Sequence, residues 1–271
     1  MGEIPGCCFR SDAKAKKHVI VWRNAWRNCK NTGEFPMKVI LSLDCSTGWT
    51  ALGLIEGLEP LGEITLSLSR RQSARLPALV DTLLMDSGKN LEEIDEFAVT
   101  TGPGYFTGIR VGLSYITGLA YALGKNVACV PTLLAMAFPY LAEGINVAAV
   151  LRARTDSLFA AIYRLCGGKT ETVMEGRLMT PSEFMSLFGD QDTRSTIFVG
   201  NDLGTFFDLE KLSSKALFYS TSPVSGLAIA TIAASGEVES IPPGTVEANY
   251  YRGPDIGVAG ARKGITRNQN R

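Results

Sequence analysis

The residues best suited to chemistry lie between a strand-like run and a long apolar segment. Residues 100–112 read T-T-G-P-G-Y-F-T-G-I-R-V-G. A strand that feeds a glycine-rich turn into a helix presents unpaired backbone N–H groups and the positive end of the helix dipole. Gly102, Gly104 and Thr107 are therefore candidates for binding a phosphate or carboxylate. The alternative is that the glycines only let the strand and helix pack closely.

The spacing of this loop differs from those of the common nucleotide loops. A phosphate loop needs Lys and Ser or Thr after its last glycine, but Ile109 and Arg110 follow Gly108. The dinucleotide pattern G-x-G-x-x-G also fails, because Thr107 stands where its third glycine belongs. The spacing therefore predicts a turn that could bind an anion, and it does not predict an NAD or P-loop ATP site.

A second candidate lies at the end of the first predicted strand, where Asp44 precedes Ser46 and Thr47. These three residues could face a phosphate or a nucleotide. Alternatively, Asp44 is a turn residue that accepts hydrogen bonds from the next backbone N–H groups, as aspartate often does. The residue types leave both readings open.

Most of the chain contains no histidine, the residue that most often serves as a general base or a zinc ligand. The only histidine is His18, close to the N-terminus. Ser-His-Asp or Cys-His catalysis and histidine-ligated zinc are therefore not expected in the remaining sequence. We predict no catalytic residue and no metal site.

These candidates are positioned by an alternation of strands and helices. The first lobe has the element order of a ribonuclease H-like lobe, as in actin-like ATPases: three strands, then helix, strand, helix, strand, helix. A second lobe begins near residue 146. The predicted strands are 39–45, 50–56, 62–69, 94–100, 127–130, 147–151, 158–165, 171–175, 196–200 and 216–219. The predicted helices are 76–85, 106–123, 132–141, 182–187 and 225–234.

Two of these helices could form a surface for a partner protein. The helix at 107–123 is apolar nearly all round, so it is either fully buried or half buried and half in an interface. Arg110 could meet an anion or a partner carboxylate, or could be a solvated or ion-paired residue. The interface candidates are Leu76, Leu79, Val80, Leu83, Arg110, Val111, Ser114, Tyr115, Gly118, Leu119 and Ala122.

The charge is unevenly distributed along the 271 residues. Residues 1–36 carry seven Lys or Arg against three Asp or Glu, and residues 252–271 carry five against one. Residues 37–251 therefore hold 15 basic and 23 acidic side chains. Such an acidic body is a poor nucleic-acid binder on its own, because phosphate contacts need clustered Lys or Arg. If the protein serves a nucleic-acid reaction, we expect a partner to hold the nucleic acid.

Composition also bears on location. No apolar stretch reaches the roughly 18 residues that span a bilayer, and no secretory signal is visible. The six cysteines show no C-x-x-C pair and no zinc spacing. A reduced, cytoplasmic compartment is the plainest reading.

Regular patterning begins near Met37. We expect residues 1–36 to be a poorly ordered extension or a mis-assigned start, with a short amphipathic helix at residues 18–29 as the alternative. The expected domains are a first lobe at 37–143, a second lobe at 144–252 and a disordered tail at 253–271.

The motifs L-S-L-D-C-S-T (residues 41–47) and T-G-P-G-Y-F-T-G-I-R-V-G (residues 101–112) resemble the TsaB family. The likeness covers residues 37–252, including Leu76-Pro77, Pro131-Thr132 and the closing Asn249-Tyr250-Tyr251-Arg252. TsaB is a subunit of the bacterial machinery that makes N6-threonylcarbamoyladenosine (t6A) in tRNA. The resemblance implies an α/β, actin-like (ASKHA) fold of two ribonuclease H-like lobes, the second degenerate.

The resemblance also implies a role. TsaB is an inactive paralogue of the transferase TsaD, with which it pairs through the two helices named above, and TsaE, an ATPase, is a further partner. We therefore expect no catalysis by this chain alone and no cofactor of its own, with ATP and metal on the partners and tRNA reached through the complex. Exposed helices that await TsaD also make a homodimer plausible. The alternatives are a free-standing small-molecule kinase or glycoprotease-like peptidase, and an RNA-binding module that uses the basic ends.

The chain departs from the family pattern at three places. Tyr105 stands where the family usually has serine, and Gln72-Ser73 where it often has a histidine. Arg152 replaces the aspartate of an Asp-Ala-Arg segment. Because no base or metal ligand accompanies the glycine-rich loop, we interpret that loop mainly as a hinge that delivers the 107–123 helix to a partner.

Overall fold

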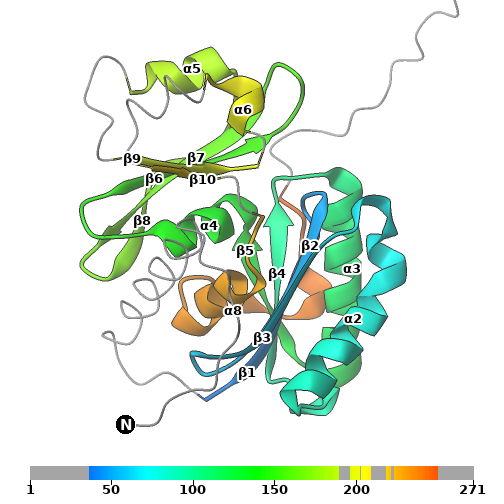
Figure 1. Ribbon diagram of the computed structural model, residues 1–271. Helices are drawn as coiled ribbons and strands as arrows, with labels where there is room; N and C mark the ends of the chain where they lie inside the picture. The colour runs from blue at the N-terminus through cyan, green and yellow to red at the C-terminus, as the bar shows by residue number, and fades with distance from the viewer. Residues whose placement is uncertain (1–36, 189–195, 202, 209–217, 221–222, 250–271) are drawn as a thin grey trace, which may run out of the picture.

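A computed structural model describes residues 37–188, 196–201, 203–208, 218–220 and 223–249. The predicted extension at 1–36 and the tail at 253–271 lie outside these residues. The described chain forms two β-sheets, one above the other in Figure 1, with helices on their faces. The first sheet has six strands in the order β11-β5-β4-β1-β2-β3, and the second has five in the order β10-β9-β6-β7-β8.

The first sheet is built around β1. The β1 sequence is an almost continuous apolar run, and all six of its residues are buried. This is the pattern expected of a strand covered on both faces. Strands β2 and β3 follow as antiparallel neighbours, while β4 lies parallel to β1 and β5 parallel to β4. The bounds are β1 Val39–Asp44, β2 Trp49–Glu56, β3 Glu59–Ser67, β4 Glu96–Gly102, β5 Asn126–Pro131 and β11 Ser240–Ile241.

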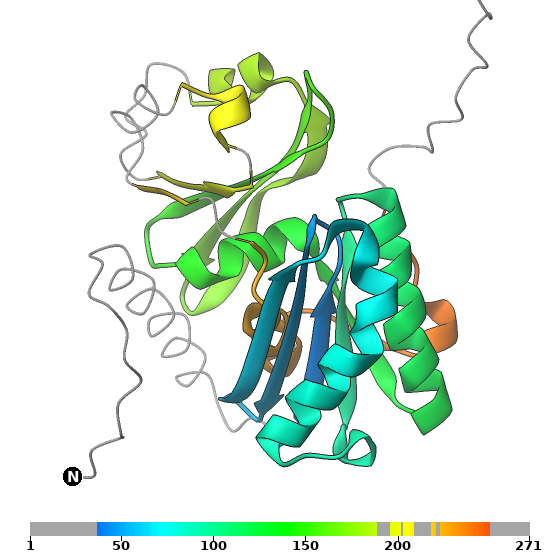
Figure 2. The same ribbon diagram turned by 45° about the vertical axis from the view of Figure 1, so that its right-hand side comes forward.

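Two long helices cover one face of this sheet. Helices α2 (Gln72–Ser87) and α3 (Phe106–Leu123) lie side by side, as Figures 1 and 2 show from two directions. They end at Gly88 and Gly124, whose φ angles of 67° and 62° are in the left-handed region that glycine tolerates. The predicted bounds of α3 are therefore confirmed, whereas α2 begins four residues earlier than its predicted start. Short 3₁₀ turns, η1 (Ser69–Arg71) and η2 (Leu91–Glu93), flank α2.

The opposite face of the first sheet is covered by helix α8 (Gly226–Ser235). There the backbones of β2 and α8 nearly touch, because a Cβ added at Gly53 would lie 2.3 Å from the Gly226 carbonyl carbon. The buried Ser42 hydroxyl of β1 donates to the carbonyl oxygen of Gly226 at 2.6 Å and so ties the helix to the central strand.

This arrangement corrects the predicted boundary of the second lobe. Residues 144–252 were assigned to that lobe as a block, but α8 packs on β1 and β2, and β11 pairs with β5. The 3₁₀ turn η5 (Pro243–Thr245) then lies against α3. The physical reason is that α8 is apolar on almost every side and buries seven of its residues. Such a helix needs cover on opposite sides, and it finds that cover between the first sheet and α4.

The second sheet repeats the strand order of the first. The five strands β6 to β10 correspond in chain order to β1 to β5. With this correspondence, the spatial order β8-β7-β6-β9-β10 is the same as β3-β2-β1-β4-β5. This repetition confirms two ribonuclease H-like lobes and hence the actin-like fold. The bounds are β6 Asn146–Arg152, β7 Leu158–Cys166, β8 Lys169–Met179, β9 Thr196–Gly200 and β10 Phe218–Ser220.

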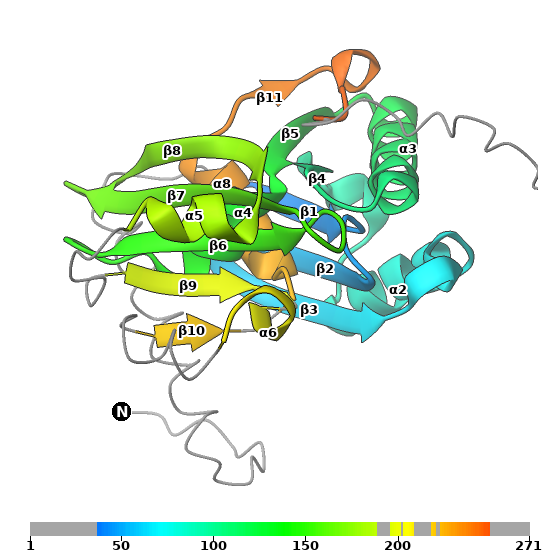
Figure 3. The same cartoon turned by 90° about the horizontal axis from the view of Figure 1, so that it is seen from above.

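The helices among the described residues of the second lobe are short, which agrees with its predicted degeneracy. Helix α5 (Pro181–Ser186) has six residues and α6 (Leu203–Phe206) has four. The two lobes share one apolar core through helix α4 (Thr132–Ala137) and the 3₁₀ turn η3 (Phe138–Tyr140), all of whose residues are buried. Figure 3, a view from above, shows the second sheet lying over the first lobe.

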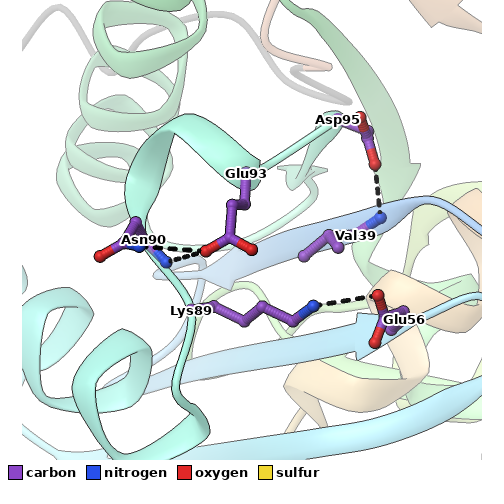
Figure 4. A network of polar contacts seen from close by, with 6 residues as sticks. All are labelled: Val39, Glu56, Lys89, Asn90, Glu93 and Asp95. Atoms are coloured by element: carbon purple, nitrogen blue, oxygen red, sulfur yellow. Dashed lines mark hydrogen bonds and ion pairs between the residues drawn. The ribbon is translucent and has the colours of Figure 1, made fainter.

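The end of the first lobe away from the glycine-rich loop is closed by polar contacts (Figure 4). Lys89 forms an ion pair with Glu56 at 2.9 Å, and the Asp95 carboxylate accepts a hydrogen bond from the Val39 N–H at 2.9 Å. The Glu93 carboxylate accepts from the Asn90 N–H at 2.7 Å and completes a capping box. These contacts hold the starts of β1 and β4 and the end of β2 at this end of the sheet.

Substitution of Gly53 tests the contact between β2 and α8. We expect Gly53→Ala to lower the free energy of unfolding by about 1–3 kcal/mol, because the new methyl group would meet helix backbone that cannot move aside. Gly118→Ala on α3 is the matched control. No described atom lies within 4 Å of its added Cβ, so it should gain about 0.5–1 kcal/mol. Urea unfolding measures both, and equal stability of Gly53→Ala and the unaltered protein would contradict the contact.

Candidate functional site

The candidate site lies at the carboxyl ends of parallel strands in both sheets. Strands β1 and β4 run parallel and end at Asp44 and Gly102, while β6 and β9 run parallel and end at Arg152 and Gly200. The loops after these four strands therefore meet between the lobes. This is the position at which α/β proteins usually place a ligand.

The glycine-rich loop packs against the turn that follows β1. A Cβ at Gly104 would lie 2.2 Å from the Ser46 carbonyl oxygen, and one at Gly108 would lie 2.0 Å from that of Cys45. The Tyr105 N–H donates to the same Ser46 oxygen at 2.7 Å. The close approach that these glycines permit is thus to the protein's own backbone, which favours the packing alternative over an anion cradle.

The other end of the loop is held by the last described residue. Gly102 has φ 116°, and a Cβ there would lie 2.6 Å from the Asn249 carbonyl oxygen. The Asn249 N–H donates to the Thr101 carbonyl oxygen at 2.8 Å. Of the predicted anion-binding residues in this loop, Thr107 is the exposed one.

Asp44 is completely buried below the turn. Its Oδ1 accepts hydrogen bonds from the Ser46 N–H at 3.0 Å, the Ser46 hydroxyl at 2.5 Å and the Thr100 hydroxyl at 2.6 Å. Its Oδ2 has no hydrogen-bond partner among the described residues. Burial therefore raises the pKa of Asp44 above its usual range, and the hydrogen bonds from Ser46 and Thr100 oppose this shift only in part. The contacts match the turn-residue reading of Asp44.

Gln72 is a structural part of this turn that the sequence did not predict. Its side-chain amide donates to the carbonyl oxygens of Trp49 at 3.0 Å and Thr47 at 3.2 Å. An amide provides two donors for two turn carbonyls, which a histidine in one tautomer does not. The only signal in the sequence was that glutamine stands where the family often has a histidine. The side chain is buried in the structure, and a buried amide needs hydrogen-bond partners.

The space between the lobes at this point is small. A cavity of about 130 Å³ lies between the β1–β2 turn, the glycine-rich loop and the end of β6. Small-molecule sites usually enclose about 300–1,000 Å³. The cavity is lined by Ser46, Thr47, Gly48, Trp49, Gly104, Tyr105, Leu151, Arg152 and Asn201. A wider, open hollow of about 750 Å³ shares Tyr105 and Arg152 and continues along residues 153–156.

The cavity thus contains Ser46, Thr47 and Gly104 from the predicted anion site and places Arg152 opposite them. A guanidinium at this position brings positive charge where the family pattern has a carboxylate. Among the described residues, no group of three or more His, Cys, Asp or Glu side chains could hold a metal ion. In the same part of the chain, no helix is long and apolar enough to cross a membrane.

The predicted partner-surface residues fall into a buried group on α2 and a group on α3 that reaches the surface. Leu76, Leu79, Val80 and Leu83 are buried in the core of the first lobe, so these four interface candidates are corrected to core residues. They were misplaced because helical spacing identifies an apolar face but not what covers it. The α3 candidates reach the surface: Arg110, Ser114, Gly118 and Ala122 are exposed, and Val111, Tyr115 and Leu119 are half-buried.

Two further apolar side chains enlarge this surface. Met85 of α2 is 74% exposed and Tyr121 of α3 is 80% exposed. Gly118 lies one turn before Tyr121 on α3, and no described atom lies within 4 Å of a Cβ added there. These exposed apolar side chains on two neighbouring helices are the reason to consider this face as a protein interface.

Comparison with known proteins places this geometry in a family. The family model described as "TsaD: tRNA N6-adenosine threonylcarbamoyltransferase" matches residues 62–248. A Bacillus subtilis relative, "tRNA threonylcarbamoyladenosine biosynthesis protein TsaB", is 24% identical over 60% of this chain and 71% of its own length. The Haemophilus influenzae protein of the same name is 33% identical over 44% of this chain and 51% of its own length.

Solved structures agree with this placement at the level of the fold. "YeaZ from Pseudomonas aeruginosa" superposes with a TM-score of 0.65 at 23% identity, covering 79% of this chain and all of that one. A second Pseudomonas aeruginosa structure, an uncharacterized protein described as similar to the peptidase YeaZ, gives a TM-score of 0.67 at 24% identity and covers 80% of this chain.

The titration of Asp44 gives a test of its buried position. Because its pKa is raised on folding, the unfolded chain loses the proton at lower pH than the folded protein does. Asp44 therefore stabilises the fold fully below about pH 4, and this contribution is lost as the pH rises toward the folded pKa. Asp44→Asn has no such proton, so its stability relative to the unaltered protein should increase between pH 4 and pH 8.

Urea unfolding across that pH range measures the difference. Asp44→Ala is the control, because it removes the acceptor for Ser46 and Thr100 and should be destabilising at every pH. If Asp44→Asn became less stable relative to the unaltered protein as the pH rose, Asp44 would be a stabilising ionised carboxylate and our interpretation would be wrong.

Proposed function

The chain belongs to the TsaD family of tRNA N6-adenosine threonylcarbamoyltransferases, and from this membership we propose that it is the TsaB-type subunit of the system that makes t6A in tRNA. Its relatives named TsaB carry that pathway in their names. The reaction of the system is threonylcarbamoyl transfer to the adenosine next to the anticodon.

In this proposal the chain supports catalysis by another subunit. The supporting observation is that Asp44 and the glycines of the glycine-rich loop are used in contacts within the chain. Asp44 accepts hydrogen bonds from Ser46 and Thr100, and the glycine-rich loop is packed on the carbonyls of Cys45 and Ser46. The alternative of a free-standing kinase or peptidase depended on Asp44 facing a ligand, and its complete burial gives that alternative no support.

The observation that carries the proposal is the surface formed by α2 and α3. Met85, Tyr121 and the α3 residues around Gly118 expose apolar area with room for a neighbouring helix. We propose that a TsaD-type transferase pairs with this surface through two helices of its own. The absence of a side chain at Gly118 would let the partner helix approach closely. A homodimer through the same surface would form only when the transferase is missing.

The remaining parts of the system are assigned to partners. A TsaE-type ATPase joins the complex, ATP and metal are bound by the partner subunits, and this chain has no cofactor of its own. The complex acts on tRNA in the cytoplasm.

Gly118 provides a sharp test of the pairing. Gly118→Arg should abolish co-elution with the cognate transferase in size-exclusion chromatography, because a long charged side chain would fill the space that the partner helix needs. The isolated chain should stay folded, since Gly118 is exposed and no described atom lies within 4 Å of the first side-chain atom added there. Gly118→Ala keeps the position small and should retain the complex. A stable complex with Gly118→Arg would place the interface elsewhere.

Reconstitution tests the supporting role. The transferase and ATPase subunits should form t6A in unmodified tRNA only when this chain is added, and the chain alone should form none. Asp44→Asn should sustain the same rate as the unaltered chain, because that substitution preserves the shape of a buried structural group. A loss of rate by 100-fold or more with an intact complex would instead make Asp44 a catalytic group. Mass spectrometry of tRNA nucleosides measures the product.

A further inference from the structure

Arginine is concentrated where the two lobes meet. The small cavity is lined from residues 46–49, 104–105 and 151–152 and by Asn201, and residues 69–72 are hydrogen-bonded to the 46–49 turn. The segments 46–49, 68–75, 102–110 and 151–156 contain no lysine and one carboxylate, Asp156. We call their basic residues the arginine rim. Its members are Arg70, Arg71, Arg75, Arg110, Arg152 and Arg154.

Hydrogen bonds hold the first-lobe part of the rim beside the cavity. The Ser69 N–H donates to the Gly48 carbonyl oxygen at 3.0 Å, which fixes η1 and its arginines next to the β1–β2 turn. Ser69 has φ 49°, a backbone conformation that non-glycine residues rarely adopt, so the chain is held in a sharp bend there. Gln72 ties the start of α2 to the same turn. Arg152 reaches this turn from the second lobe as part of the cavity lining.

Aromatic rings are exposed on the same segments as the arginines. Tyr105 is 54% exposed, Phe106 40% and Trp49 39%, and Tyr105 and Trp49 both line the cavity. The Arg110 guanidinium lies 3.8 Å from the centre of the Phe106 ring, so at least one rim cation is already stacked on a ring.

The rim differs from the basic residues at the far ends of the two sheets. There Lys38 pairs with Glu96, Lys89 with Glu56 and Arg164 with Glu171, each at 2.9 Å or less. At the rim, none of Arg70, Arg71, Arg75 and Arg152 has an ion-pair or hydrogen-bond partner for its side chain within the described residues. The net negative charge of residues 37–251 therefore hides one strongly positive edge.

We propose that the arginine rim binds unpaired RNA, so that this subunit contacts the tRNA directly. Guanidinium groups form paired hydrogen bonds with phosphate oxygens, and exposed aromatic rings stack on bases that are not in a helix. Arginines and exposed rings that lie around one small cavity fit a single strand, whereas a duplex hides its base faces from Tyr105 and Trp49. The proposal rests on the proposed function, because that function brings the chain to a tRNA loop.

Fluorescence anisotropy with the full chain tests the proposal. The probes are a labelled, unmodified single-stranded RNA of anticodon-loop sequence and a duplex RNA of equal length. The triple variant Arg70→Ala, Arg71→Ala, Arg152→Ala should bind the single strand at least tenfold more weakly in 50 mM salt. The slope of log K against log salt should fall by about 2, since each phosphate contact on a single strand contributes roughly 0.7.

Matched variants separate the rim from general charge. Lys89→Ala, Lys125→Ala, Arg164→Ala removes three positive charges at the far ends of the lobes and should leave the affinity within twofold. Tyr105→Ala should weaken single-strand binding about 5-fold to 100-fold, whereas Tyr105→Phe keeps the ring and should restore it. Equal losses for the two triple variants, or equal affinity for duplex and single strand, would overturn the proposal.

The outcome is distinguishable from that of the proposed function. The rim triple variant should still co-elute with the transferase, because the α2–α3 surface is unchanged. If instead it bound RNA normally but lost the transferase, the rim would be a contact for an acidic protein surface and the RNA proposal would be wrong. If the Gly118→Arg test failed while RNA binding behaved as expected, only the pairing surface would need to be reassigned.

Discussion

The architecture depends on one close contact between two stretches of backbone. At Gly104 and Gly108 the loop between β4 and α3 lies so near the carbonyls of Cys45 and Ser46 that any side chain would collide with them. This contact fixes the start of α3 relative to the end of β1. Because α2 is tied to the same turn through Gln72, the contact sets the relation of both helices to the sheet.

The same contact occupies the place where the sequence predicts an anion site. The Tyr105 N–H donates to the Ser46 carbonyl oxygen and so joins the loop after β4 to the turn after β1, and the Asp44 carboxylate below them is sealed from solvent. Arg152, Trp49 and Tyr105 line the small cavity and remain partly exposed. In our proposals, the rim of this cavity and the outer helices serve the function, and the interior of the cleft does not.

Much of this could be predicted from the sequence, because much of it is local. The bounds of α3 follow from an apolar run that ends at Gly124, and the loops that line the cleft follow from strand ends. What could not be predicted depends on packing between distant segments. Leu76 and Leu79 have the same spacing in a core helix as in an interface helix, and only the structure shows them covered. The return of α8 to the first sheet rests on Gly53, Gly226 and Ser42, which carry no signal of their partnership along the chain. The arginine rim was hidden for the same reason, since the net charge of a long segment averages over surfaces that folding separates.

The return of α8 and β11 to the first sheet has a consequence for how this protein emerges from the ribosome. The first sheet cannot cover its second face until residues 226–241 have been synthesised, long after its own five strands and two helices are complete. Until then the nascent chain would carry an open apolar face on β1 and β2, a surface of the kind that chaperones bind. The second lobe, inserted between the two halves of the first, can form in that interval. The order of synthesis therefore differs from the order of completion: the lobe that begins first is finished last.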